Sequence, residues 1–159
     1  MRVSGEANGD QGRVMLSEAS KDWIAKLTLP LSVVLPRKRK DDKIFQLNLN
    51  VYRNAHFHIL NDAKITFLRA VEPQLREMGR IDQHSPLLFS YVIFRPSRRT
   101  FDIMNVASVI DKFICDAMIQ TGVIKDDNHE HISRFIASFG GVDKDNPRCE
   151  LTIRADNER

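Results

Sequence analysis

Residues 87–94 read Leu-Leu-Phe-Ser-Tyr-Val-Ile-Phe, which is a nearly continuous apolar run. A run this short and this apolar predicts a central β-strand buried on both faces, because a half-exposed strand would alternate with polar residues. Such a strand must lie inside a covered sheet, so it constrains the fold more than any other segment. The basic segment 95–100 that follows predicts a loop leaving the end of the strand.

Two amphipathic helices are predicted, one before and one after this strand. Apolar residues recur at three- and four-residue spacing over 54–78 and again over 105–121, which is the period of a helix with one buried face. Asn105 is the expected N-cap of the second helix and Gly122 its C-terminal stop. Pro73 should end or kink the first helix, because it lacks a backbone N–H.

Shorter segments with β-forming composition complete the order of elements. They lie at 23–35, 44–49, 131–139 and 149–154. Pro30 indicates an edge or bulge position within the first of them, because proline cannot donate to a sheet ladder. Residues 37–43 predict a charged loop and 140–147 a turn. The expected order is therefore strand, helix, strand, helix, strand, strand.

The chain has 159 residues, of which 42% are hydrophobic. This length suits one domain with a substantial core, which we assign to 21–159, after a flexible, polar tail at 1–20. No apolar run approaches the roughly 20 residues of a transmembrane helix, and the N-terminus lacks the apolar stretch of a signal peptide. Cys115 and Cys149 make no disulfide framework, so we expect reduced cysteines, a cytoplasmic location and no membrane partner.

Basic residues gather in a few places, although the formal net charge is only +3. The run 37–40 is one cluster, and the loop after the apolar run is another. Basic clusters of this kind bind the phosphates of nucleic acids, although they also occur in ordinary solvated turns. The candidate DNA-binding residues are Arg37, Lys38, Arg39, Lys40, Arg53, Arg98 and Arg99.

Carboxylates lie at both ends of the predicted helix 105–121. Asp102 precedes this helix, and Asp126 and Asp127 follow it. Hard divalent cations prefer oxygen ligands, so these acids beside arginines favour a metal-dependent nuclease. The helix spans about 24 Å. A shared site therefore requires either that the next strand return beside the first or that a second subunit close the gap.

Lys112 and Asp116 lie four residues apart on the polar face of the same helix. They form either an exposed ion pair of small energetic value or a site where the ammonium group stabilises charge on a phosphate. The histidine pairs, His56 with His58 and His129 with His131, are more typical of surface positions than of metal ligation. The sequence contains no glycine-rich phosphate loop and no Cys/His zinc spacing.

Taken together, these motifs resemble the RusA family of Holliday junction resolvases, in particular its phage-type members. The family pattern is Asp-x-Asp-Asn, then a helix with Lys-x-x-x-Asp, then Gly-x-x-x-Asp-Asp. The matching segments are Asp102-Ile-Met104-Asn105, Lys112-Phe-Ile-Cys-Asp116 and Gly122-Val-Ile-Lys-Asp126-Asp127, with an entry segment at 48–56. The resemblance covers roughly residues 47–153.

The resemblance implies an α+β fold, in which helices flank a mixed β-sheet, and a homodimer. It implies a crossover junction endodeoxyribonuclease that resolves four-way DNA junctions by paired nicks and uses Mg²⁺, with Mn²⁺ as a substitute. The roles that it implies are metal ligation by Asp102 and Asp127, with Asp126 beside them, and catalysis by Asp102, Lys112 and Asp127.

Met104 departs from the family pattern, because it stands at the position of the second aspartate. A thioether is a poor ligand for Mg²⁺. Either Asp111, Asp126 or the carbonyl of Asn105 supplies the missing oxygen, or the chain is a catalytically weak or inactive protein that binds junctions or protein partners. A nuclease for flaps or other branched DNA is a third interpretation.

Overall fold

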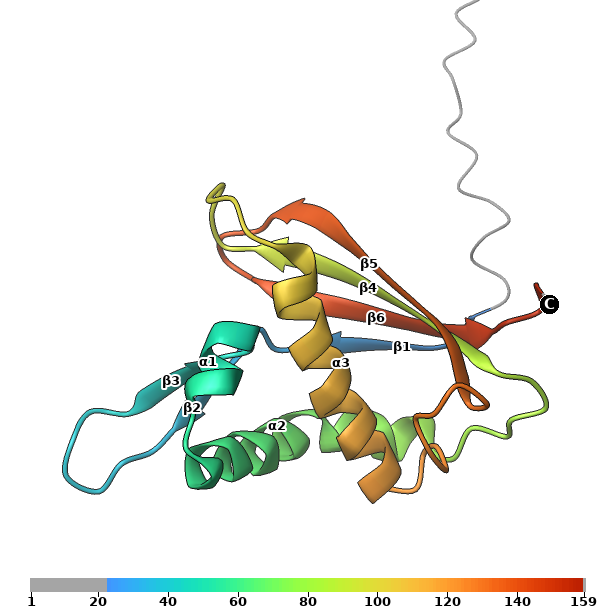
Figure 1. The fold of residues 1–159 in the computed structure, drawn as a ribbon, viewed down its shortest axis with the longest axis horizontal. Helices are drawn as coiled ribbons and strands as arrows, with labels where there is room; N and C mark the ends of the chain where they lie inside the picture. Colours follow the sequence, from blue (N-terminus) through green and yellow to red (C-terminus); the bar gives the residue numbers. More distant parts are fainter. Residues whose placement is uncertain (1–22, 159) are drawn as a thin grey trace, which may run out of the picture.

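The computed structural model describes residues 23–158 (Figure 1), so the tail predicted at 1–20 lies outside the described residues. The strands are β1 (Trp23–Leu29), β2 (Ser32–Leu35), β3 (Lys43–Gln46), β4 (Leu87–Arg95), β5 (Ile132–Val142) and β6 (Arg148–Ala155). The helices are α1 (Leu49–Asn54), α2 (Phe57–Met78) and α3 (Ile103–Gln120). The predicted α+β class, a mixed sheet flanked by helices, is confirmed.

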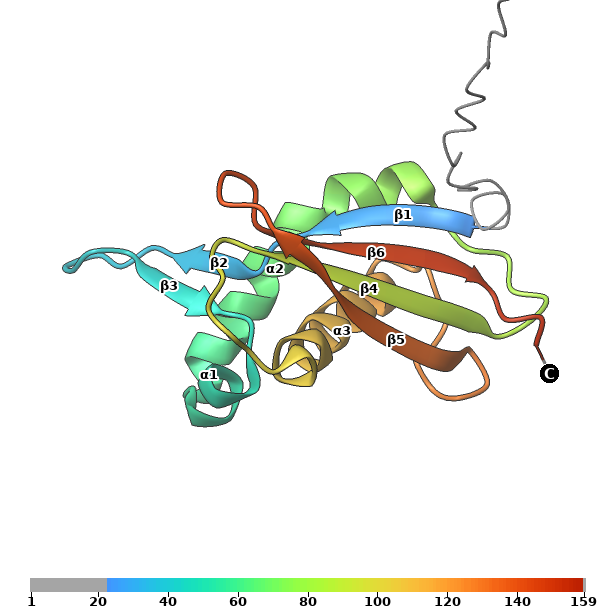
Figure 2. The ribbon, with the colours of Figure 1, turned by 90° about the horizontal axis from the view of Figure 1, so that it is seen from above.

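The main sheet has four strands in the order β1-β6-β4-β5. β4 pairs in parallel with β5 and antiparallel with β6. Phe89, Tyr91 and Ile93 of β4 are fully buried. On the opposite face Leu88 is also buried, but Ser90 and Val92 are only half-buried. The expectation that both faces of this strand are buried therefore holds only at the start of the strand, because α2 and α3 cover only one face of the sheet (Figures 1 and 2).

Phe113 of α3 lies at the centre of the helical layer. Its ring packs against Phe67 of α2, Tyr52 of α1 and Phe45 of β3, with centroid separations of 5.6, 6.4 and 6.3 Å. Burying a phenylalanine side chain stabilises a fold by about 1.5–3 kcal/mol. This cluster therefore holds the separate β2–β3 hairpin and the short helix α1 against α3.

The first helix and the segment before it differ from the expectations. α2 runs past Pro73 to Met78, because Val71 and Leu75 are buried on either side of the proline and hold the last turns against the core. The segment expected to be extended at 44–49 ends as β3 at Gln46. The unpredicted helix α1 then begins, where Asn48 accepts a hydrogen bond from the N–H of Val51 at 2.9 Å.

Two glycines expected in a turn belong instead to β5. A Cβ at Gly140 would lie 2.6 Å from Cγ1 of Val92, so only glycine fits against the neighbouring strand there. Gly141 has a φ of 130°, which L-residues rarely adopt. The pairing of β4 with β5 shifts at this point, so the glycines form a bulge that lets the strand continue to Val142.

Neither cysteine is paired in a disulfide, as the sequence predicted. Cys115 and Cys149 are free and buried, and burial raises the pKa of the Cys149 thiol to about 12. Within residues 23–158, no helix has the length and apolar character needed to cross a membrane.

Candidate active site and nucleic-acid interface

Basic side chains from three separate segments lie at one end of the molecule. The run 37–40 is at the tip of the β2–β3 hairpin, Arg53 is in the last turn of α1, and Arg98 and Arg99 are in the loop between β4 and α3; all are exposed. Figures 1 and 2 show these three segments at the same end. The fold therefore places the predicted DNA-binding residues on three segments at the same end of the molecule, which we call the basic end, with the hairpin tip projecting away from the other two.

A hydrogen bond between two helix starts fixes part of this arrangement. The side-chain oxygen of Asn105, on α3, accepts from the N–H of Leu49, at the start of α1, at 2.8 Å. The sequence predicted Asn105 as the N-cap of α3, which is wrong, since the helix begins at Ile103. Asn105 instead joins α1 to α3, and so helps to position Arg53 relative to the loop arginines.

Asp102 is the residue that caps α3. Its Oδ1 accepts hydrogen bonds from the N–H groups of Met104 and Asn105, at 2.9 and 3.3 Å. A carboxylate at this position also interacts favourably with the positive end of the helix dipole. Part of the role of Asp102 is therefore to start the helix, and Met104 next to it is 51% exposed.

Asp126 and Asp127 lie in the loop at the other end of α3. Asp126 accepts from the N–H of Asp127 at 2.7 Å and from the side chain of Asn128 at 2.8 Å, which closes a tight turn. β5 runs parallel to β4, with Leu87 paired to Ile132 and Arg95 to Val142. Asp127 therefore precedes the start of the strand pair, whereas Asp102 follows its end, about 30 Å away along a nine-residue strand.

The structure thus does not bring Asp102 and Asp127 together within one chain. The strand that follows Asp127, β5, does pair with β4, but the two strands are parallel. The start of β5 therefore lies beside the start of β4, and Asp127 stays far from Asp102 at the other end. Among residues 23–158, no group of three His, Cys, Asp or Glu side chains is placed to hold a metal ion, and this includes the histidine pairs.

Asp111, in the middle of α3, is the centre of a small polar cluster. The sequence indicated this residue only as an alternative metal ligand. Its Oδ1 accepts from the hydroxyl of Tyr91, on β4, at 2.6 Å and from Sγ of Cys115 at 3.6 Å. Burial raises the pKa of Asp111, and repulsion from Asp127 adds to the rise, while the hydrogen bond from Tyr91 opposes it. Asp111 is therefore a constrained carboxylate within electrostatic reach of a predicted ligand.

The sequence only weakly indicates that Tyr91 belongs to the site, and it does not indicate the hydrogen-bond partner of Tyr91 at all. The apolar run 87–94 contains one phenolic hydroxyl, and a buried hydroxyl of that kind needs a partner. The run itself does not say which helix residue would face the hydroxyl. Burial and the nearby charge of Asp111 raise the pKa of Tyr91 well above its ordinary value, so it stays protonated and donates to the carboxylate.

Lys112 has a competitor for its expected ion pair. The Nζ of Lys64, from α2, lies 2.9 Å from Oδ2 of Asp116, whereas Nζ of Lys112 lies 3.9 Å from Oδ1 of the same carboxylate. The side chain of Lys112 is 49% exposed. Lys64, which the sequence did not single out, therefore neutralises Asp116 and leaves the ammonium of Lys112 available to an external phosphate.

A groove of about 430 Å³ lies between α2 and α3, next to this ion pair. Phe113 and Leu68 are among its apolar residues, and Lys64 and Asp116 are among its polar ones. The groove therefore places an apolar surface directly beside the Lys64–Asp116 ion pair.

No protein-family model matches the chain, and no curated protein sequence is significantly similar to it. The residues of the site and their geometry are therefore the basis on which a function can be inferred.

Proposed function

We propose that the chain is a Mg²⁺-dependent endodeoxyribonuclease that resolves four-way DNA junctions by paired nicks, with a RusA-like fold and as a homodimer. The observation that carries the proposal is the half-exposed ammonium of Lys112 on α3, with the carboxylate of Asp111 next to it in the chain and the charge of Asp127 close enough to raise the pKa of Asp111. Carboxylates, an ammonium group that is only weakly paired within the chain and phosphate-binding arginines are the parts that metal-assisted cleavage of a phosphodiester requires.

The proposed magnesium site uses two carboxylate ligands, because the second aspartate of the family pattern is replaced by Met104. Mg²⁺ is commonly held by one or two carboxylates, with water and substrate phosphates completing its coordination. Burial and the charge of Asp127 both raise the pKa of Asp111, and a bound cation would offset that repulsion. Asp111 and Asp127 would hold the ion, with Asp126 next to them, whereas Asp102 could join it only from a second subunit.

When bound, Mg²⁺ supplies positive charge to the scissile phosphate and favours ionisation of the attacking water. Lys112 places an ammonium group where negative charge develops on the phosphate. Arg98 and Arg99 bind flanking phosphates, for which the planar guanidinium is well suited. The run 37–40, at the tip of the projecting hairpin, extends this contact along a DNA arm.

The homodimer is part of the proposal because of the symmetry of the substrate. A four-way junction has an approximate two-fold axis, and a pair of identical subunits related by a two-fold axis would present two equivalent sites to it. Two sites placed in this way can nick two strands at related positions.

The alternative is a junction-binding protein that cuts poorly or not at all. It is favoured by the exposed Met104 at the family aspartate and by the use of Asp102 as a helix cap. Such a protein would retain the basic end and would not need the Asp111–Asp127 pair. A nuclease for flaps or other branched DNA is the third candidate.

A panel of labelled substrates separates these functions. A four-way junction, a flap and a linear duplex are each incubated with the protein, in Mg²⁺ and in EDTA, and both binding and nicking are followed. The proposal expects binding to the junction in either buffer and paired nicks only in Mg²⁺. Binding with no nicking supports the alternative, and preferred nicking of the flap supports the third candidate.

A further inference from the structure

Arg95, the last residue of β4, is half-buried and has no carboxylate partner among residues 23–158. Its Nε is buried and makes no hydrogen bond within the described chain. The guanidinium lies over the ring of Phe101, 4.6 Å from the ring centroid. Because a partly buried cation without a partner is costly, this geometry indicates an anion that comes from outside the chain.

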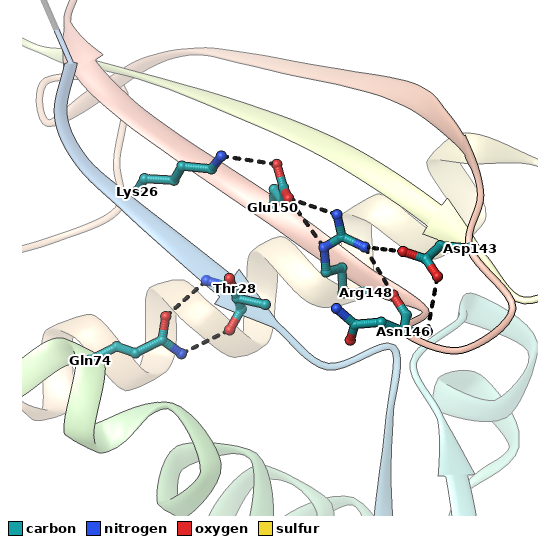
Figure 3. Close-up of polar contacts among 7 residues, drawn as sticks. All are labelled: Lys26, Thr28, Gln74, Asp143, Asn146, Arg148 and Glu150. Carbon is teal, nitrogen blue, oxygen red and sulfur yellow. Dashed lines mark hydrogen bonds and ion pairs between the residues drawn. The ribbon is translucent and has the colours of Figure 1, made fainter.

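Arg148 on β6 provides an internal comparison. Its guanidinium also lies over an aromatic ring, 4.1 Å from the centroid of Phe94. However, its Nη1 donates to Asp143 at 2.8 Å and its Nη2 to Glu150 at 3.0 Å (Figure 3). Both arginines therefore stack on an aromatic ring, but within residues 23–158 only Arg148 is paired with carboxylates of the fold. The guanidinium of Arg95 is left free to bind an anionic ligand.

An exposed aromatic ring lies next to the Arg95–Phe101 pair. Phe139 of β5 meets Phe101 edge to face, with centroids 5.7 Å apart and planes at 70°. Phe139 is 50% exposed, so part of it is available to a flat ligand. Arg98 and Arg99 are exposed in the loop that joins Arg95 to Phe101. Cationic and aromatic side chains at one place are the features with which proteins bind unpaired nucleotides.

We propose that Arg95, Phe101 and Phe139 bind one unstacked nucleotide of the DNA substrate. Its base stacks on Phe139, and its phosphate contacts Arg95, with the loop arginines on the neighbouring phosphates. The inference rests on the proposed function only in taking DNA as the ligand, and it requires no nuclease activity. A site of this kind would make the protein bind DNA with unpaired or unstacked bases more tightly than an uninterrupted duplex.

A tryptophan reporter tests the stacking directly. The chain has one tryptophan, Trp23, which is 47% exposed, so Phe139→Trp in a Trp23→Phe background leaves a single reporter at the proposed site. The protein is titrated in EDTA with a four-way junction, a single-stranded oligonucleotide and a linear duplex. We expect strong quenching of the tryptophan fluorescence by the junction and the single strand, and little by the duplex.

Two matched variants test affinity. Phe139→Ala should weaken junction binding roughly 5- to 150-fold, which is the range for loss of one stacked base. Ile136→Ala, on the same strand and 45% exposed, removes a similar exposed apolar side chain away from Arg95 and should leave affinity unchanged. Arg95→Gln should reduce the slope of log affinity against log salt by about 0.7–0.9, equivalent to one phosphate.

The outcomes are distinct. If the protein binds the junction but its reporter is not quenched, or if Phe139→Ala and Ile136→Ala bind alike, the nucleotide site is wrong and the proposed function stands. If the protein binds none of the three DNAs, the proposed function and this site both fail. Quenching by the junction and the single strand together with a selective loss in Phe139→Ala supports the site, whatever the nicking activity.

Discussion

Replacing Asp102 by alanine and by serine separates its two candidate roles. The carboxylate accepts from two backbone N–H groups at the start of α3. Loss of such a cap costs about 1 kcal/mol, within a range of roughly 0.5–2 kcal/mol, whereas serine is as good a cap as aspartate. For a chain of this length, we expect Asp102→Ala to lower the melting temperature by about 2–4 °C and Asp102→Ser to leave it nearly unchanged.

Nicking activity reports the other role, because serine cannot replace a carboxylate as a magnesium ligand. Thermal denaturation and junction nicking are therefore measured on both variants, with Asp82→Ala as the control for loss of an exposed carboxylate. If Asp102 is a ligand, both variants lose nicking while only the alanine variant loses stability. Wild-type stability in Asp102→Ala would refute the capping role, and wild-type nicking in Asp102→Ser would refute ligation.

Three further predictions concern the residues around α3 and the hairpin. Because burial raises the pKa of Asp111 above its ordinary 3.8, the ionised carboxylate destabilises the native state as the pH rises through the raised value. The free energy of unfolding, measured in urea over a pH series, should fall in this way for the wild type but not for Asp111→Asn. If it falls with pH to the same extent in both proteins, the prediction is contradicted. Lys64→Met frees Asp116 to attract Lys112, so nicking should fall roughly two- to fivefold. Adding Asp116→Asn should restore it, and no restoration would reject the competition between the lysines. Replacing all four residues of the run 37–40 by glutamine should lower the salt slope of junction binding by about 0.9 for each phosphate that the hairpin neutralises in the wild type; an unchanged slope would remove the hairpin from the interface.

The order of the main elements followed from periodicity, because each long segment has one face that must be buried. The three-to-four spacing located α2 and α3, and the apolar run 87–94 located β4. The wrong details are local ones that tertiary contacts decide. Pro73 stays inside α2 because the residues around it are buried, and Asn105 bonds to α1 instead of capping α3.

The candidate site was less accessible from sequence, because its geometry depends on strand direction. The sequence already places Asp102 and Asp127 at opposite ends of one helix, but only the parallel pairing of β4 with β5 shows that the next strand does not bring them together within one chain. The partners that define the remaining groups come from distant segments. Tyr91 contacts Asp111 from 20 residues away and Lys64 contacts Asp116 from 52 residues away, and no local pattern indicates either contact.

The most direct test of the proposed nuclease compares nicking of a four-way junction by the wild-type chain and by Asp127→Asn, in Mg²⁺ and in EDTA. We expect paired nicks by the wild type in Mg²⁺ alone. We also expect a loss of about 100-fold or more in Asp127→Asn, with junction binding retained, because a ligand of the ion has been removed without changing the basic end. Equal nicking by the two proteins, or wild-type nicking that persists in EDTA, would contradict the proposed metal-dependent mechanism.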